Sequence, residues 1–318
     1  MDPATSLMQP SRCSTRVRCR GCQSDDVRLI GVKNGAFAHR PFEFYACATC
    51  SFQFVEPVLD FSIYDDAYYA GKGPDPAVNY EQEYEDYTAG GRILEYQDLL
   101  QIARTSLQLP DHGSDVEWLD FGCGAGGLLR FLRDHANWGV GTGKRLKLTG
   151  HDVGSYARRL AEEDGFAILP LERLQAMDEA FHIISCIEVL EHLPSPMDVI
   201  ALLGRLLRPG GVLLLTTGNM HSLAARCRGI HFSYCIPEIH ISLLNPSLLE
   251  RLYWGAGLVR LKVQYRGTVE FRILKRLRTF ALNPFLVRLA RSRPIVALAD
   301  FVYGTSAMPC ARKPLIQE

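Results

Sequence analysis

The sequence predicts an α/β protein with a doubly wound, mostly parallel sheet. Between residues 116 and 217, short apolar runs of strand length alternate with segments of helical periodicity, and glycines follow the first run. This alternation is typical of βαβ units whose sheet is covered on both faces. With 318 residues and 47% apolar side chains, the chain is long enough to bury a sizeable core.

The expected elements follow one another in a regular order. Apolar runs predict strands at residues 116–121, 146–151, 166–169, 181–186, 212–217 and 258–265, and a last strand within 307–313. Helical periodicity predicts helices at residues 92–103, 128–133, 156–164, 197–207 and 246–255. We divide the chain into a flexible tail, a cysteine-bearing module, a helical linker or lid, a sheet core and a C-terminal part, at residues 1–12, 13–60, 61–110, 111–220 and 221–318.

Charge and composition exclude several classes of protein. Lysine plus arginine equal aspartate plus glutamate at 35 each, so no global field attracts nucleic acid and no nucleic-acid partner is expected. Residues 1–8 lack the basic start and apolar run of an export signal, and no window holds about 18 uninterrupted apolar residues. Of the ten cysteines, four form two tight pairs and the rest are scattered, which suits reduced thiols. We therefore expect a soluble, cytoplasmic protein.

A glycine-rich turn links the first strand of the core to its first helix. Glycines at such a junction permit a tight turn and let a ligand approach the helix N-terminus. Gly122, Gly124 and Gly127 fit a dinucleotide pattern, but Asp120 would place negative charge beside a pyrophosphate. S-adenosylmethionine carries a sulfonium and an ammonium group, so Asp120 favours this cofactor, with Asp152 accepting the ribose hydroxyls. A structural turn and a nucleotide site are the alternatives.

Three stretches, in order, resemble motifs of class I S-adenosylmethionine-dependent methyltransferases: residues 116–127, 181–194 and 206–215. The resemblance implies a Rossmann-like seven-stranded sheet, with the methionyl part of the cofactor over the glycine turn. The cofactor contacts that we expect are Asp120, Gly122, Cys123, Gly124, Gly126, Asp152, Glu172 and Glu188. Many family members carry an acid directly after the third strand, and here Glu172 is the nearest candidate because residues 169–171 intervene.

Two cysteine pairs, Cys19 with Cys22 and Cys47 with Cys50, stand in the N-terminal module. Four thiolates at such spacing close a tetrahedral Zn²⁺ site and leave no open position, so the expected zinc is structural. A module without metal and a redox pair are the alternatives. The module resembles the N-terminal zinc ribbon that precedes the methyltransferase domain in bacterial enzymes acting on sugars, polysaccharides and secondary metabolites.

A cluster of acids and a histidine follows the fourth strand of the core. Glu188, Glu191 and His192 lie on one face if this turn is helical, and His240 is a candidate fourth ligand for Mg²⁺ or Zn²⁺ at the acceptor site. The pattern resembles ubiquinone-biosynthesis O-methyltransferases and small-RNA 3′-end methyltransferases, where two glutamates and two histidines hold a divalent ion. Alternatively, His192 or His240 binds the acceptor or removes its proton without metal, or the cluster is purely structural.

Two further segments leave two interpretations each. The lid contains seven tyrosines between residues 64 and 96, which serve as packing and lid surface or contact the substrate; His231 and Tyr234 are similar candidates. Residues 271–299 carry seven basic residues and no acid. This stretch is an amphipathic helix in peripheral contact with anionic membrane, or a solvated helix packed on its own domain.

Together these features predict an enzyme. We expect an S-adenosylmethionine-dependent methyltransferase that transfers a methyl group to a hydroxyl of a small molecule or of a glycan or lipid precursor. The alternative is a catalytically inactive, methyltransferase-like binding or scaffold protein. A nicotinamide-dependent oxidoreductase is disfavoured by Asp120 and by the absence of a recognisable hydride-transfer site.

Overall fold

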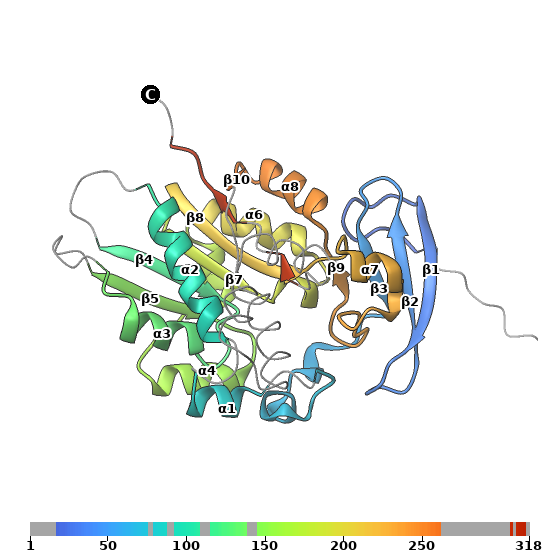
Figure 1. Cartoon of the computed structure of the whole chain (residues 1–318), viewed down its shortest axis with the longest axis horizontal. Coiled ribbons are helices and arrows are strands. Elements are labelled where there is room, and N and C mark those ends of the chain that lie inside the picture. The colour runs from blue at the N-terminus through green and yellow to red at the C-terminus, as the bar shows by residue number, and fades with distance from the viewer. Residues whose placement is uncertain are drawn as a thin grey trace, which may run out of the picture.

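The computed structural model describes residues 17–75, 79–87, 92–108, 115–138, 145–261, 306–307 and 310–315. Within these ranges it contains a four-stranded antiparallel sheet and an eight-stranded, mostly parallel sheet (Figure 1). The predicted tail at residues 1–12 and the basic stretch at 271–299 lie outside the described residues.

The eight-stranded sheet confirms the predicted doubly wound core. Its parallel strands lie in the order β8-β7-β4-β5-β6 and are β4 (Val116–Phe121), β5 (Leu146–His151), β6 (Ala167–Ile168), β7 (Phe181–Ile187) and β8 (Leu207–Gly218). Two antiparallel strands, β11 (Ser306–Ala307) and β12 (Ala311–Arg312), pair with β8, and β10 (Val259–Arg260) pairs with β12 at the edge of the sheet. The chain runs from β4 towards β6 on one side and returns through β7 and β8 on the other. The carboxyl end of β4 is therefore at the switch point where such sheets bind ligands.

Alternate residues of the central strands are buried on opposite faces of this sheet. Ile184 and Leu213 belong to the apolar cluster that includes α6 and α8, whereas Ile183 and Leu214 belong to the cluster that includes α2 and α3. Because both faces are covered, the strands read as continuous apolar runs. The helices of the core are α2 (Arg92–Ser106), α3 (Gly127–His135), α4 (Ser155–Glu163), α5 (Leu171–Gln175), α6 (Pro196–Leu206) and α8 (Pro246–Gly255).

The smaller sheet forms a ribbon, by which we mean residues 17–56. Its strands are β1 (Val27–Asn34), β2 (Pro41–Cys47) and β3 (Gln53–Glu56), and the C-terminal part of the chain adds β9 (Ser242–Leu243). Phe52 and Phe54 share one apolar cluster with Leu244 and Leu248. The ribbon is therefore packed continuously onto the core of the eight-stranded sheet, and its own sheet includes residues far beyond the predicted 13–60 module.

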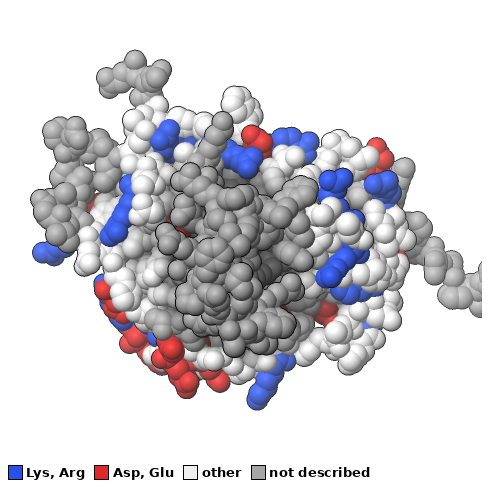
Figure 2. All heavy atoms as spheres, viewed as in Figure 1, with Lys and Arg blue, Asp and Glu red and all other residues white. Residues whose placement is uncertain are grey.

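The lid and the segment after β8 consist of short elements. The lid contains η1 (Phe61–Ile63), η2 (Tyr68–Lys72) and α1 (Tyr80–Glu85), and α7 (Leu223–Arg228) and η4 (Gly229–His231) follow β8. A further short element, η3 (Leu190–His192), lies between β7 and α6. No helix in the described part of the chain is both long enough and apolar enough to cross a membrane. Figure 2 shows acidic side chains gathered at the lower left, in the region of α1 and α4, and basic side chains at the right, over the ribbon. Basic side chains also lie along the top and left of this face, so only the acidic ones gather in one region.

Candidate active site

The glycine turn, residues 122–127, lies at the switch point of the sheet. Gly122, Gly124 and Gly126 have φ values of 81°, 52° and 84°, a conformation that glycine adopts far more readily than other residues. A Cβ atom at Gly122 would also lie 2.3 Å from Cγ2 of Val189. Backbone conformation and the close approach of Val189 therefore both require glycine at the end of β4.

Asp120 lies at the carboxyl end of β4 and is almost fully buried. Its carboxylate accepts a hydrogen bond of 2.7 Å from Oγ of Ser185, which in turn accepts one from Nε1 of Trp118. Burial raises the pKa of Asp120 to about 7, although the Ser185 hydrogen bond and the charge of Arg92 lower it. A cationic group bound beside Asp120 would favour the ionised carboxylate.

Asp152 directly follows β5 and closes the glycine turn from the neighbouring strand. Its carboxylate accepts hydrogen bonds from the N–H groups of Gly124 (2.9 Å) and Gly154 (2.8 Å) and from the hydroxyl of Tyr69 (3.4 Å). Burial raises the pKa of Asp152, and the two backbone hydrogen bonds partly offset this. Asp152 therefore ties the turn to β5, and the Tyr69 hydroxyl takes a place from which a ligand hydroxyl would donate.

A cavity of about 170 Å³ opens at the carboxyl ends of β4, β5 and β7. Its lining residues are Tyr64, Tyr68, Tyr69, Tyr80, Phe121, Gly122, His151, Asp152, Val153, Leu171, Ile187, Glu188, Val189, His192, Leu193 and Val199. Of the predicted cofactor contacts, Gly122, Asp152 and Glu188 line this cavity. Asp120 and Gly124 are not among the lining residues; Asp120 is hydrogen-bonded to Ser185, and Gly124 donates to the lining residue Asp152.

Two predicted cofactor contacts point away from this cavity. The Cys123 thiol is buried against the sheet, where a Cβ atom at Gly150 would lie 2.8 Å from its Sγ. Glu172 is exposed in the first turn of α5, whereas its neighbour Leu171 lines the cavity. Successive helical residues point about 100° apart, so a helix that turns Leu171 inward turns Glu172 outward.

The lid contributes four tyrosines to the cavity wall: Tyr64, Tyr68, Tyr69 and Tyr80. The ring centroids of Tyr69 and Tyr80 are 5.0 Å apart, and those of Tyr64 and Tyr68 are 4.9 Å apart. These spacings are typical of favourable aromatic pairs. The tyrosines that the sequence placed in the lid thus pack on one another and also border the space where a ligand would bind.

The structure brings together three of the four residues predicted to form the second metal site. One potential ligand atom from each of Glu191, His192 and His240 lies within 4.8 Å of the other two. We call these three residues the acceptor cluster. Glu188 is adjacent but outside the cluster, with a positive φ of 52° and one buried carboxylate oxygen that has no hydrogen-bond partner in the described structure.

Backbone carbonyls orient both histidines of the acceptor cluster. Nδ1 of His192 lies 3.2 Å from the carbonyl oxygen of Ile239 and 3.0 Å from the Tyr64 hydroxyl, and Nδ1 of His240 lies 2.5 Å from the carbonyl oxygen of Tyr234. A carbonyl oxygen only accepts, so these contacts suit the tautomer with the hydrogen on Nδ1, which would leave the Nε2 lone pair of each imidazole available. Burial lowers the pKa of both imidazoles to about 4, so both are neutral near pH 7.

Two carboxylates lie beside these neutral imidazoles: the buried Glu191 and the partly buried Glu188. Glu191 accepts hydrogen bonds from the hydroxyls of Tyr234 (2.5 Å) and Thr217 (2.9 Å). Burial and the charge of Glu191 raise the pKa of Glu188 well above its usual value, because two neighbouring carboxylates resist joint ionisation. The carboxylate of Glu191 and the two neutral imidazoles are a donor set that fits a divalent cation, and the charge of such a cation would relieve the repulsion between Glu191 and Glu188.

Sequence reasoning missed two residues at this site. Thr217 lies near the carboxyl end of β8. Ligands bind at this edge of a parallel sheet, so the position of Thr217 at the end of a predicted strand could have identified it. Arg92 pairs with the buried Glu95 at 3.0 Å, and its charge acts on both Asp120 and Glu188. Arg92 precedes the glycine turn by a whole helix, so no local pattern links them.

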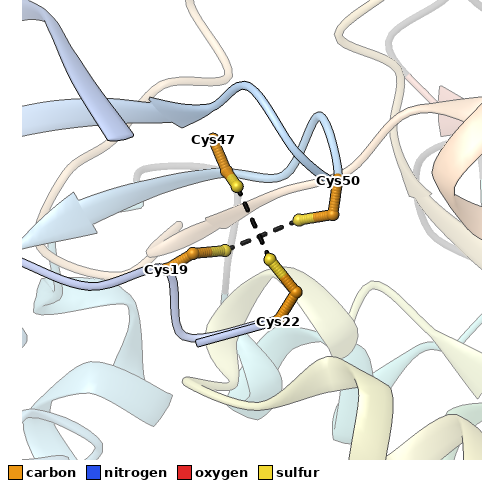
Figure 3. A group of neighbouring side chains, drawn as sticks. All are labelled: Cys19, Cys22, Cys47 and Cys50. Atoms are coloured by element: carbon orange, nitrogen blue, oxygen red, sulfur yellow. Dashed lines mark hydrogen bonds between the residues drawn. The ribbon is translucent and has the colours of Figure 1, made fainter. Parts of the chain in front are cut away.

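The four paired cysteines converge at the edge of the ribbon. Their sulfurs point toward one another from two loops (Figure 3), at 3.5 Å between Cys19 and Cys50 and 3.6 Å between Cys22 and Cys47. A tetrahedral zinc site with Zn–S bonds of about 2.3 Å has sulfurs about 3.8 Å apart. The spacing of the sulfurs therefore fits a closed four-thiolate site.

A second, larger cleft of about 680 Å³ lies between the ribbon and α7. Ile30, Met220, Ile230 and Leu243 contribute to its wall. Neither the glycine turn nor the acceptor cluster borders it. The smaller cavity is therefore the candidate active site, because the titratable groups and the switch point of the sheet meet there.

Comparisons with known proteins agree with this geometry. Residues 92–263 match the model of a family described as a methyltransferase domain. The ubiquinone biosynthesis O-methyltransferase of Nitrosococcus oceani is 38% identical over 110 residues, which are 32% of this chain and 43% of that protein. The enzyme of the same name from Thiobacillus denitrificans is 30% identical over 175 residues, which are 50% of this chain and 70% of that protein.

A solved structure supports the fold. Phosphoethanolamine N-methyltransferase 2 of Haemonchus contortus, in complex with S-adenosyl-L-methionine, superposes with a TM-score of 0.50 at 15% sequence identity. The match covers 91% of this chain and 71% of that one. Since the family model spans more than half of the chain, the chain belongs to the methyltransferase domain family and has the class I, Rossmann-like fold of S-adenosylmethionine-dependent methyltransferases.

Proposed function

We propose that this chain transfers the methyl group of S-adenosylmethionine to a hydroxyl of a small molecule, a class that includes glycan and lipid precursors. The observation that carries the proposal is the position of the acceptor cluster, because His192 belongs both to this cluster and to the cavity wall that contains Gly122 and Asp152. Methyl transfer is an in-line displacement, so the protein mainly aligns the acceptor and takes its proton.

Three polar residues around the glycine turn account for the cofactor. We assign the ribose hydroxyls to Asp152, whose carboxylate already accepts a hydroxyl hydrogen bond from the lid. Asp120 provides negative charge for the ammonium and sulfonium groups, which resolves its unfavourable burial. Arg92, from the helix that precedes the turn, is the proposed partner for the carboxylate of the methionyl part.

The acceptor cluster supplies a place for the hydroxyl and its proton. The neutral imidazoles of His192 and His240 each keep an Nε2 lone pair, which accepts a proton or binds a cation. Glu188, Glu191, His192 and His240 would hold a divalent ion such as Mg²⁺ or Zn²⁺, and such an ion lowers the pKa of a bound hydroxyl. Without a metal, His192 is the candidate base, because it lines the cavity.

The ribbon receives a structural role in this proposal. The four sulfur atoms have the spacing of a closed zinc site, and four thiolates leave no position for substrate. A metal held by four residues of a small antiparallel sheet would add to the stability of that sheet. Clustered, reduced thiols also suit a cytoplasmic site of action.

Two lines of support favour an active O-methyltransferase over an inactive scaffold. Asp120 and Asp152 are hydrogen-bonded beside the glycine turn and Gly122 has a positive φ, and these features support cofactor binding. The names of the matched relatives describe O-methyl transfer in ubiquinone biosynthesis. Since the chain spans 43% of the first relative and 70% of the second, the acceptor itself is a proposal of class only.

The test combines cofactor binding with transfer. Titration calorimetry should show that the full chain binds S-adenosylmethionine. Incubation with methyl-labelled cofactor and a panel of phenols and aliphatic alcohols should then label a hydroxyl, as mass spectrometry detects. The His240→Gln variant should still bind the cofactor but transfer little methyl. A chain that does not bind S-adenosylmethionine would instead support the scaffold alternative.

A further inference from the structure

We propose that the ribbon positions the acceptor cluster, and that Arg20 is the positioning residue that links the cysteine turn to His240. This inference rests on the proposed function, because it gives the cysteine-bearing ribbon a task in the methyl-transfer site. Arg20 stands between Cys19 and Gly21 in the first cysteine turn. It reaches across to the segment that carries His240.

The Arg20 side chain is held on three sides. Its Nη2 donates a hydrogen bond of 2.6 Å to the carbonyl oxygen of Ile241, the residue after His240. Its guanidinium lies 5.2 Å from the ring centroid of Phe54, and its Nε is 3.6 Å from the carboxylate of Glu56. The side chain is only 17% exposed, so this contact with Ile241 is formed inside the protein.

The same carbonyl oxygen also completes the ribbon sheet. Ile241 accepts a second hydrogen bond, of 3.0 Å, from the N–H of Val55 on β3, and β9 continues the pairing with Ser242 opposite Phe54. A carbonyl oxygen has two lone pairs, and in Ile241 both are used by the ribbon. The backbone beside His240 therefore has its position set by β3 and by the cysteine turn together.

The ribbon also holds the segment before His240. The carboxylate of Glu238 accepts hydrogen bonds from the N–H groups of Phe37 (2.8 Å) and Ala38 (3.2 Å), which belong to the hairpin between β1 and β2. Nζ of Lys33 donates to the carbonyl oxygen of Cys235 at 2.5 Å. Residues 235, 238 and 241 are thus all anchored to the ribbon.

The opposite side of this segment contacts the acceptor cluster. Oγ of Ser242 donates to the carbonyl oxygen of Leu193 at 2.5 Å, and the carbonyl oxygen of Ile239 accepts from Nδ1 of His192. The segment from 235 to 242 therefore lies between the ribbon and η3. The relative position of His192 and His240 depends on both contacts, so a change in the cysteine turn would be transmitted to the distance between these two imidazoles.

The test compares Arg20→Gln with Arg18→Gln in the full chain. Arg18 lies in the same turn but is exposed and pairs with Asp25 at the surface, so its loss leaves the Ile241 contact intact. Two readouts report on the site: histidine ¹⁵N–¹H correlation spectra, with the His240 signal assigned by His240→Gln, and titration with Mn²⁺. Bound zinc and the affinity for S-adenosylmethionine report on the rest of the protein.

Arg20→Gln should shift or broaden the His240 signal and weaken Mn²⁺ binding about tenfold, as outer partners of metal ligands do. Zinc content and cofactor affinity should stay at wild-type values, and Arg18→Gln should match wild type throughout. Arg20→Lys keeps one donor for Ile241, so it should return the His240 signal and the Mn²⁺ affinity most of the way to wild-type values. It also provides a second variant if Arg20→Gln does not fold.

Outcomes separate this inference from the proposed function. If wild-type protein does not bind Mn²⁺, the proposed metal site at the acceptor cluster is refuted. The His240 signal still tests the link between Arg20 and His240. An unchanged His240 signal in Arg20→Gln, with zinc retained, would overturn the inference. Equal changes in Arg20→Gln and Arg18→Gln would do the same, because they would indicate a general effect of the turn.

Discussion

The cysteine cluster and the acceptor cluster are both groups of potential metal ligands, yet they are built differently. The four cysteines come from two local turns, and they include the exposed Cys22 and the partly exposed Cys50. Glu191 precedes β8 in the sequence, His240 follows it, and both side chains are buried. Glu191 also accepts hydrogen bonds from Tyr234 and Thr217. One cluster is closed by its own ligands, whereas the other opens on a cavity.

This difference indicates a division of labour. Four thiolates complete a tetrahedron and leave chemistry no room, so they serve stability. A mixed set of carboxylates and neutral imidazoles at the carboxyl edge of a parallel sheet keeps lone pairs that can bind a cation or accept a proton. We therefore expect this cluster to take part in the reaction. Loss of the first cluster should therefore change stability most, and loss of the second should change turnover most.

The largest expected effect is on stability. Replacing Cys47 by Ser removes one of four thiolates, and we expect the free energy of unfolding to fall by about 5 kcal/mol or more, since metal binding contributes to folding in small ribbons. Chemical denaturation and metal analysis check this. Cys227 is an exposed cysteine outside the cluster, so Cys227→Ser should stay within about 0.5 kcal/mol of wild type. Equal stabilities of the two variants would refute a structural zinc.

Next comes a change in turnover without a change in fold. His240→Gln keeps a polar side chain of similar length but removes the Nε2 lone pair, and kcat/KM should drop about 10²- to 10⁴-fold. Thermal melting and cofactor affinity should remain near wild type. His231, in η4, is exposed, and His231→Gln is the matched control. If His240→Gln lowered the stability of the protein as much as Cys47→Ser, the proposed division of labour would be refuted.

Cofactor affinity should respond to Asp152. Its carboxylate accepts two backbone hydrogen bonds and faces the cavity, so Asp152→Ala should raise the Kd for S-adenosylmethionine about 100-fold, equivalent to about 2.7 kcal/mol. Glu172→Ala is the control in titration calorimetry, because Glu172 is exposed. If Glu172→Ala weakens binding as strongly, the sequence-based prediction that Glu172 contacts the cofactor is restored, and its exposed position does not represent the bound state.

The same comparison explains how much could be predicted from the sequence. Cysteine spacing within two tight turns is local, and the structure brings together all four predicted residues. The parallel core was also predictable, because strands such as β7 are buried on both faces and read as continuous apolar runs. Local signals suffice wherever the partners lie within one turn or one βα unit.

Features that depend on tertiary contacts could not be predicted in this way. The fourth strand of the ribbon sheet is only two residues long, Ser242–Leu243, and forms because β3 offers it a partner. Arg92 and Thr217 reach the site from separate elements without a shared motif. Glu172 failed to reach the cavity for a geometric reason, since the first turn of α5 directs Leu171 inward in its place.

A pH dependence should distinguish Asp120 from the ligands of both clusters. Its folded pKa is raised to about 7 by burial, so the folded state favours the protonated form and the contribution of Asp120 to stability falls as pH rises from about 4 to 7. A cationic cofactor favours the ionised form, so binding should weaken about tenfold between pH 8 and pH 6. Calorimetry at both pH values checks this, and Asp120→Asn should flatten the dependence. A steep dependence that persists in Asp120→Asn would assign the titration to another group.

The smallest expected effect concerns the lid. The Tyr69 hydroxyl donates to Asp152 at 3.4 Å, where we place the ribose of the cofactor, so the two donors compete for one carboxylate. Tyr69→Phe removes the competitor but keeps the ring that packs on Tyr80, and a weak hydrogen bond of this kind contributes about 0.5 kcal/mol. Cofactor affinity should therefore rise about twofold, measured by titration calorimetry against Tyr156→Phe, whose hydroxyl bonds the exposed Glu81. Weaker binding in Tyr69→Phe alone would show that the hydroxyl contacts the cofactor, and the lid would then belong with the acceptor cluster as part of the reactive region.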